Sequence, residues 1–227
     1  MKGLMMPGAF LLLAVAVVHG QGATGGWTML FDGKDTAAWR GYEKDAFPAS
    51  GWSVEADGSL HIQAGSKAGD IVTRQQYGDF ELELEWKVAE GANSGILYRA
   101  PEIPGKPAYY NAFEYQILDD AKHKDGQSAN RRAGTLYDLY EATGGELHPA
   151  GQWNQARIVA KGKHLEHWLN GKRVVVCDLG SDDYEKRLAA SKFATWEGFG
   201  THAKGHIALQ EHGDDVWFRK IRVRELR

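Results

Sequence analysis

The chain has 227 residues, of which 43% are hydrophobic and 25% charged, enough for one large domain with a well-buried core. Its formal net charge is −3, so it lacks the basic excess expected of proteins that bind nucleic acid or anionic membranes. The single cysteine, Cys177, excludes an intramolecular disulfide. Its neighbours in VVVCDLG predict a buried strand position, where a thiol is usually a small hydrophobic group rather than a nucleophile.

The first twenty residues have the order of a secretory signal peptide. Lys2 supplies a positive start, residues 8–18 form an apolar run too short to span a bilayer comfortably, and Val18-His19-Gly20 resembles a cleavage site. We therefore expect residues 1–20 to be removed and residues 21–227 to form a single β-sandwich catalytic domain. The mature protein, with 26 basic and 30 acidic residues, is then periplasmic or secreted without a stable membrane anchor.

Strand patterns dominate the rest of the chain. FELELEWKV, residues 80–88, alternates apolar and polar side chains, and it is followed by the turn-like EGANSG and SGILYRA, which predicts a hairpin. Residues 156–176 predict three antiparallel strands that turn at Gly162 and at Asn170-Gly171. Further strands are predicted at AFEYQIL, HIALQEHG and VWFRKIRVREL.

Helix is scarce, and only DDYEKRLAASK, residues 182–192, has the charge order of a helix, with acids first and basic residues later. Two long irregular segments, residues 100–109 and 119–132, are of a length that is usually functional or disordered in compact domains. These patterns predict an all-β fold, an antiparallel β-sandwich with one short helix and loops at its rim.

No P-loop, GxGxxG, HExxH, CxxC or nucleophile-elbow motif is present. Instead, polar residues occupy one face of otherwise apolar strands. In FEYQILDD, Glu114 and Gln116 share the face opposite Phe113, Tyr115 and Ile117. Together with other candidates they would supply acids, imidazoles, amides and a guanidinium to a sugar-processing cleft.

Two of the candidates also have a simpler interpretation. His167 alternates with Leu165 and Leu169, so it lies on an apolar face, where a satisfied core histidine is the commoner outcome. Glu85 lies on the charged face of its strand and is a weak candidate for the cleft.

Seven ordered blocks of this sequence carry a resemblance to a known family. The blocks are LFDGKDTAAWRGY, GWSVEADGSLHI, YGDFELELEWKVAEGANSGILYRA, FEYQILDD, AGTLYDLY, GQWNQARIVAKGKHLEHWLNGKRV and GHIALQEHGDDVWFRKIRVREL. Their order resembles the bacterial 3-keto-disaccharide hydrolase family over essentially the whole mature chain. A small departure is Lys220 in FRKIRV, where the family more often has Asn. The resemblance implies a concanavalin A-like lectin/glucanase fold, a jelly roll of two curved sheets.

The resemblance also implies a small carbohydrate substrate, a glycoside whose glucose unit has a ketone at C3. That ketone acidifies the hydrogen on C2, because the resulting carbanion delocalises onto oxygen as an enolate. A general base can remove this proton, the glycosidic oxygen then leaves C1, and water adds back to give net hydrolysis.

Matching the family blocks residue by residue places eight side chains around the concave face. Glu114 or a histidine is expected to be the base, and Arg99 and Gln116 are expected to orient the substrate or polarise the ketone. A divalent metal could also polarise the ketone, but no ligand spacing demands one and no cofactor is assigned. The expected catalytic residues are Glu114, His167 and His212, and the expected substrate-binding residues are Glu85, Asn93, Arg99, Gln116 and Gln210.

Two other functions remain open on the same fold. An ordinary glycosidase would use two carboxylates such as Glu85 and Glu114, although Gln116 occupies the position where sandwich glucanases carry their second acid. A carbohydrate-binding module would use the polar groups only to bind hydroxyl groups of a sugar, but it would need fewer acids and histidines.

Overall fold

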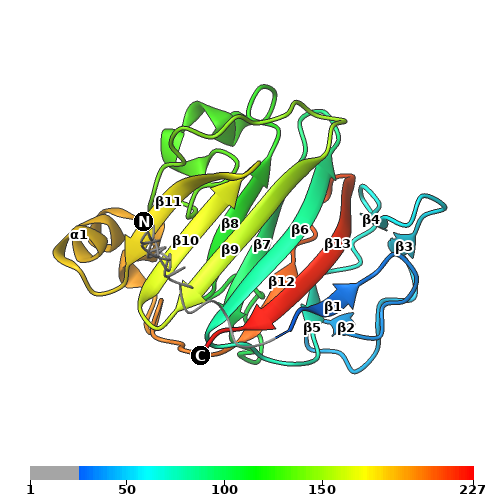
Figure 1. Ribbon diagram of the computed structural model, residues 1–227, viewed down its shortest axis with the longest axis horizontal. Helices are drawn as coiled ribbons and strands as arrows, with labels where there is room; N and C mark the ends of the chain where they lie inside the picture. Colours follow the sequence, from blue (N-terminus) through cyan, green and yellow to red (C-terminus); the bar gives the residue numbers. More distant parts are fainter. Residues whose placement is uncertain (1–25) are drawn as a thin grey trace, which may run out of the picture.

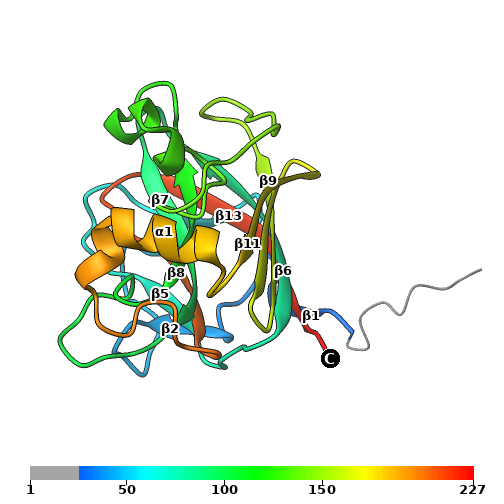
Figure 2. The ribbon, with the colours of Figure 1, turned by 90° about the vertical axis from the view of Figure 1, so that its left-hand side faces the viewer.

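The computed structural model describes residues 26–227, and the predicted signal peptide lies outside the described residues. Two antiparallel β-sheets pack face to face, and α1 lies at one end of the sandwich (Figures 1 and 2). This arrangement confirms the predicted all-β sandwich. None of the helices within residues 26–227 is long and apolar enough to cross a membrane.

The larger sheet has eight strands, ordered β11-β10-β9-β6-β13-β4-β3, with β1 paired to β13. The predicted three-strand meander is confirmed as β9, β10 and β11. The strands of this sheet are β1 (Thr28–Phe31), β3 (Trp52–Val54), β4 (Leu60–Ile62), β6 (Phe80–Val88), β9 (Asn154–Lys161), β10 (His164–Leu169), β11 (Lys172–Asp178) and β13 (Val216–Glu225).

The smaller sheet has five strands in the order β2-β5-β12-β7-β8. The predicted helix begins at Asp182 as expected but ends at Ala190, and the Ser181 hydroxyl accepts a hydrogen bond from the Tyr184 N–H at its start. The elements are β2 (Trp39–Gly41), β5 (Ile71–Thr73), β7 (Asn93–Ala100), β8 (Phe113–Leu118), β12 (His206–Leu209), α1 (Asp182–Ala190) and three 3₁₀ turns, η1 (Lys124–Gln127), η2 (Ala129–Arg131) and η3 (Lys192–Thr195).

The hairpin predicted between residues 80–88 and 94–100 is wrong. β6 pairs with β9 and β13 in the larger sheet, whereas β7 pairs with β8 and β12 in the smaller one. Residues 89–92 therefore carry the chain from one layer to the other. Both strands bury an apolar face, and they do so face to face across the core rather than edge to edge.

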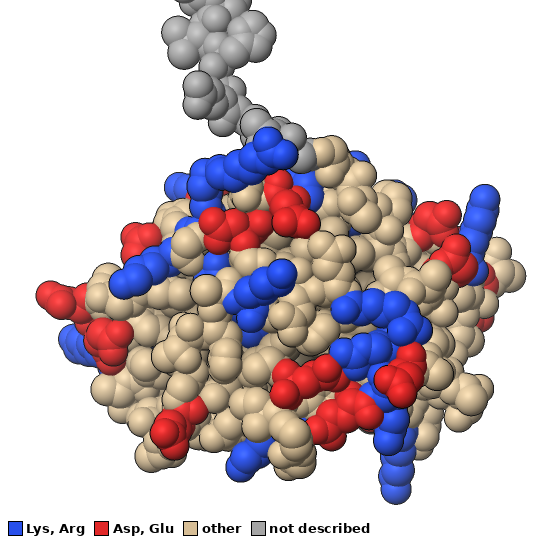
Figure 3. All heavy atoms as spheres, turned by 90° about the horizontal axis from the view of Figure 1, so that it is seen from below, with Lys and Arg blue, Asp and Glu red and all other residues tan. Residues whose placement is uncertain are grey.

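Ion pairs cover the outer face of the larger sheet. The Glu85 carboxylate accepts hydrogen bonds from Arg219 Nε at 2.6 Å and Lys220 Nζ at 2.7 Å, and Glu83 pairs with Arg222 in the same way. The expectation that Glu85 shares one face with Glu114 is therefore wrong, because Glu85 lies on the outer face of the larger sheet, whereas Glu114 belongs to β8 of the smaller sheet. Acidic and basic side chains also lie beside one another on the face shown in Figure 3.

His167 links the two sheets from within the core. Its side chain is fully buried, Nδ1 donates to the Gly134 carbonyl oxygen at 3.1 Å, and Nε2 accepts from the Tyr98 hydroxyl at 2.9 Å. Burial lowers the pKa of His167 to about 4, so the ring is neutral at physiological pH. The predicted catalytic role of His167 in the cleft is therefore wrong. The imidazole on β10 points into the core toward β7, and both of its nitrogens form hydrogen bonds within the protein.

Replacing Tyr98 by Phe tests this link between the sheets. The change leaves His167 Nε2 buried without its donor, so we expect a loss of about 1–3 kcal/mol in the free energy of unfolding. Urea denaturation measures the loss. Turnover per folded molecule should stay at the wild-type value, and a selective fall in turnover with unchanged stability would contradict the structural role.

Candidate functional site

The smaller sheet presents a polar surface on the side that faces away from the core. Phe113, Tyr115 and Ile117 are buried in the core, so the intervening Glu114 and Gln116 point outward from β8. Asn93 from β7, with Gln210 and His212 from the segment after β12, lies on the same surface. Together these five side chains line a cavity of about 430 Å³, so the structure brings together five of the eight predicted site residues.

Gly95 makes room for the Glu114 carboxylate. Gly95 on β7 is opposite Gln116 on β8, and the Glu114 side chain lies over its Cα. A Cβ atom at position 95 would stand 2.7 Å from Glu114 Oε1 and 3.0 Å from its Cγ. The glycine therefore provides a floor without a side chain and lets the carboxylate lean across β7.

Loops that connect the strands form the walls of this cavity. The polar segment 119–132, which contains η1 and η2, supplies one wall, and the segment around η3 supplies another. The Trp196 ring stacks on Tyr110 with centroids 4.9 Å apart and also borders the cavity. Sequence patterns did not single out these wall residues, which are Tyr109, His123, Lys124, Asp125, Arg131, Tyr137, Lys192 and Trp196.

The Glu114 carboxyl is suited to exchange a proton near neutral pH. Burial raises its pKa to about 7, and the negative charges of Asp70 and Asp125 act in the same direction, while the Lys192 ammonium opposes them. None of the described residues donates a hydrogen bond to this carboxylate, so it is available to a ligand. Desolvation in turn lowers the pKa of Lys192.

Several buried polar atoms on this surface have no hydrogen-bond partner within the described part of the chain. They are Asn93 Oδ1, Gln116 Oε1 and Nε2, and Gln210 Oε1. Buried polar groups in proteins are nearly always satisfied, and those that are not usually await a ligand or water. Donors and acceptors grouped beside a carboxylate and an aromatic ring match the hydroxyl groups and ring face of a sugar.

Arg99 lies outside this cavity, contrary to its prediction as a substrate-binding residue. Its φ of +49° interrupts the alternation of β7, and the pairing with β12 shifts register between Ala100 and Leu97. The buried guanidinium donates from Nε and Nη2 to the Gly78 carbonyl oxygen, each at 3.2 Å. Asn93 and Arg99 are an even number of residues apart, which places two side chains on one face of a strand if its alternation is regular. The alternation of β7 is interrupted at Arg99, so this prediction does not apply.

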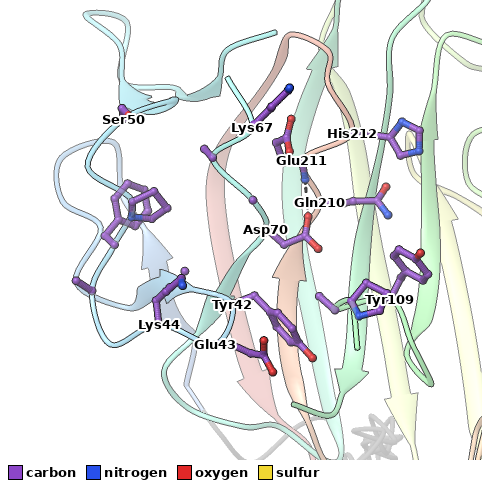
Figure 4. Close-up of a pocket in the computed structure, with 18 of the residues that line it drawn as sticks. Tyr42, Glu43, Lys44, Ser50, Lys67, Asp70, Tyr109, Gln210, Glu211 and His212 are labelled. Atoms are coloured by element: carbon purple, nitrogen blue, oxygen red, sulfur yellow. Dashed lines mark hydrogen bonds between the residues drawn. The ribbon is translucent and has the colours of Figure 1, made fainter. Parts of the chain in front are cut away.

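A second and larger cavity of about 950 Å³ adjoins the first. Tyr109, Gln210 and His212 line both, and Figure 4 shows them on one side of the larger cavity, with Asp70 near its centre. Residues 105–109 of the irregular segment 100–109 also line this cavity. The sequence offered no pattern that would have identified Asp70, which lies one residue before the short strand β5.

We assign no metal-binding residues. Within residues 26–227, no group of three or more His, Cys, Asp and Glu side chains is arranged to hold a metal ion.

The fold and this polar surface define a carbohydrate-active β-sandwich, and comparisons with known proteins agree. A non-specific endo-β-1,3(4)-glucanase shares the fold with a TM-score of 0.52 at 12% identity, covering 88% of this chain and 92% of the glucanase. A crystal structure from Parabacteroides distasonis, described provisionally as a glycosyl hydrolase, is 31% identical with a TM-score of 0.81, covering 89% of this chain and 94% of that one.

Residues 26–224 match the model of the 3-keto-α-glucoside-1,2-lyase-like domain. A relative from Bacteroides thetaiotaomicron, named 3-keto-disaccharide hydrolase, is 38% identical over 230 aligned positions, covering 88% of this chain and 79% of the relative. The chain belongs to the 3-keto-α-glucoside-1,2-lyase-like family and is a glycoside-cleaving enzyme.

Replacing Gly95 by Ala tests the placement of the Glu114 carboxylate. The added methyl group would stand 2.7 Å from Glu114 Oε1, too close for a van der Waals contact, and would push the carboxylate away from the floor of the cavity. We expect turnover of a cleaved glycoside to fall by about 10-fold or more, measured together with the melting temperature. Full turnover in the folded variant would show that this position of Glu114 is not needed.

Proposed function

We propose that this enzyme cleaves 3-keto-disaccharides by general acid–base chemistry at C2 and C1 of the 3-keto-glucose unit. Family membership and the name of the Bacteroides relative support the substrate class. The observation that carries the mechanism is the Glu114 carboxyl, which has a pKa near 7 and lies above Gly95 among unsatisfied amides, with no hydrogen-bond donor from residues 26–227.

Glu114 acts as the base in this proposal. Its ionised carboxylate removes the proton on C2, and the electron pair delocalises onto the C3 oxygen as an enolate. The Gln116 amide donor and the Lys192 ammonium, which line the same cavity, supply positive charge and hydrogen bonds for that oxygen. The electron pair then forms the C1–C2 double bond as the glycosidic oxygen leaves.

Trp196 and Tyr109 offer aromatic surface at the edge of the cavity, where an apolar sugar face can pack. Asn93 and Gln210 carry acceptor atoms that match the hydroxyl groups of the same sugar unit. In the second half of the reaction, water adds to C1 and Glu114 returns its proton to C2, which completes a net hydrolysis.

The pair of carboxylates required by an ordinary glycosidase does not form from Glu85 and Glu114. Glu85 points outward from the larger sheet and Glu114 outward from the smaller one, so the whole core separates them. Glycosidases need their two carboxyl groups within about 10 Å of each other.

Replacing Glu114 by Gln tests the proposed base. We expect kcat for 3-keto-trehalose to fall by about 10²–10⁴-fold, because the amide cannot accept the C2 proton. Glu85→Gln is the matched control, since it makes the same chemical change on the outer face of the other sheet and should leave kcat unchanged. Equal activity of Glu114→Gln and wild type would exclude this base, and no wild-type cleavage of any 3-keto-glycoside would overturn the proposed function.

The pH dependence of stability gives an independent measure of Glu114. Its pKa is raised from 4.5 to about 7 in the folded protein, so the folded state binds this proton more tightly than the unfolded state. The resulting stability is present below pH 4.5 and is lost as the pH rises through 7. Relative to wild type, Glu114→Gln should gain up to about 3 kcal/mol between about pH 4 and pH 8. Parallel stability curves for the two proteins would contradict the raised pKa.

A further inference from the structure

We propose that the larger cavity binds the leaving half of the disaccharide and that Asp70, which lines this cavity beside Gln210, protonates the departing glycosidic oxygen. This inference rests on the proposed function, which requires an acid at that oxygen but does not identify one. It assigns a second catalytic residue and a second sugar subsite.

The position of Asp70 follows from the pairing of the smaller sheet. Ile71, the first residue of β5, is paired with Leu209 of β12, so Asp70 and Gln210 lie side by side just beyond this pair. The Asp70 Oδ1 atom accepts a hydrogen bond from the Glu211 N–H at 2.8 Å. The carboxyl group is directed toward Gln210, which lines both cavities (Figure 4).

Two strands, β12 and β7, separate β5, which Asp70 precedes, from β8, which carries Glu114. Three strand spacings place the β5 and β8 backbones about 14 Å apart. Both side chains shorten this distance, because Glu114 leans over Gly95 of β7 and Asp70 points toward Gln210 after β12. Gln210 N donates to the Gly95 carbonyl oxygen at 3.0 Å, so the residues between the two carboxyls form one continuous floor.

In this proposal the two acids act on neighbouring atoms of one sugar. With the 3-keto unit over Gly95, Glu114 faces C2 and the glycosidic bond at C1 extends toward Asp70 and the larger cavity. Both cavity volumes, about 430 and 950 Å³, lie within the range of about 300–1,000 Å³ found for small-molecule sites. The larger one is lined by aromatic and polar side chains that fit a second sugar, among them Tyr42, Phe47, Ser50 and Lys67.

The proposed reaction requires molecules in which Asp70 is protonated and Glu114 is ionised. Burial, with a smaller contribution from the Glu211 charge, raises its pKa to about 6, so part of the population carries a proton near neutral pH. The Glu211 N–H holds one oxygen in place, and the other oxygen has no donor among the residues that the structure describes. Asp70 is thus held in position while one oxygen faces the cavity.

The proton balance of the reaction closes with these two groups. In the elimination, Glu114 gains the C2 proton, the C1–O bond breaks, and the departing oxygen takes the proton of Asp70 to leave as an alcohol. In the hydration, water forms a bond to C1 and gives a proton to Asp70, while Glu114 returns its proton to C2. Both carboxyl groups regain their starting states, and no further reactant is required.

Asp70→Asn can be tested with two substrates that differ only in the leaving group. 3-keto-trehalose releases a sugar alcohol that needs a proton, whereas p-nitrophenyl 3-keto-α-glucoside releases a stable phenolate that does not. We expect kcat/KM of the variant to fall by about 10²–10⁴-fold for 3-keto-trehalose and by less than about 10-fold for the aryl glycoside. Asp57→Asn is the matched control, because Asp57 also accepts a backbone N–H, from Ser59, but does not line either cavity.

Hydrogen–deuterium exchange at C2 of 3-keto-glucose in D₂O separates this role from that of Glu114. Asp70→Asn should retain the exchange and Glu114→Gln should lose it. Equal losses of kcat/KM for both substrates, or unchanged cleavage of 3-keto-trehalose, would overturn the assignment of Asp70 while leaving the proposed function intact. If the wild type cleaves neither substrate, the proposed function itself fails, and the assignment fails with it.

Discussion

The arrangement of this protein depends on the burial of one face of every long strand in a single core between two sheets. Burial of Phe113, Tyr115 and Ile117 leaves the intervening side chains of β8 no position except the outer surface. A shift of one residue in the register of β8 would exchange the two sets and place Glu114 in the core. The same free energy that holds the sandwich together therefore orients its candidate base.

The two outer faces of the sandwich have become different environments. On the larger sheet, glutamates alternate with core residues and form ion pairs at the surface with arginines and a lysine from β13. On the smaller sheet, loops fold over the outer face and remove water, so Glu114 and Asp70 have raised pKa values. Acids of the same chemical kind are thus solvated ion-pair partners on one sheet and proton-transfer groups on the other.

Single-residue features of the backbone set the shape of the cleft as much as its side chains do. Gly95 leaves space for a carboxylate, and the positive φ of Arg99 ends the regular alternation of β7. The apolar end of this outer face, with Val72, Leu97 and Ala208, is covered by Ala108 and Ala112. The larger cavity borders this covered region, since Ala108 and Tyr42 also line it.

Alternation and turn residues in the sequence determined most strands, the helix and the shared face of Glu114 and Gln116, because these depend on neighbours within a few residues. The ordered blocks added the family. The polar set of Asn93, Gln116, Gln210 and His212 around Glu114 could also be named in advance. His167 could be predicted only as a residue on an apolar face, and that face became the core.

Tertiary structure alone decided which sheet each strand joins, and with it the fate of the remaining candidates. A strand pattern is the same whether its partner lies beside it or across the core, so the 80–88 and 94–100 segments read as a hairpin although they belong to opposite layers. Because β6 belongs to the larger sheet, Glu85 lies on the opposite side of the molecule from Glu114. Because β5 pairs with β12, Asp70, which no local pattern identifies, lies beside Gln210. The pairing of strands that are distant in the chain cannot be predicted from the residues around each strand, because it results from the packing of the whole core.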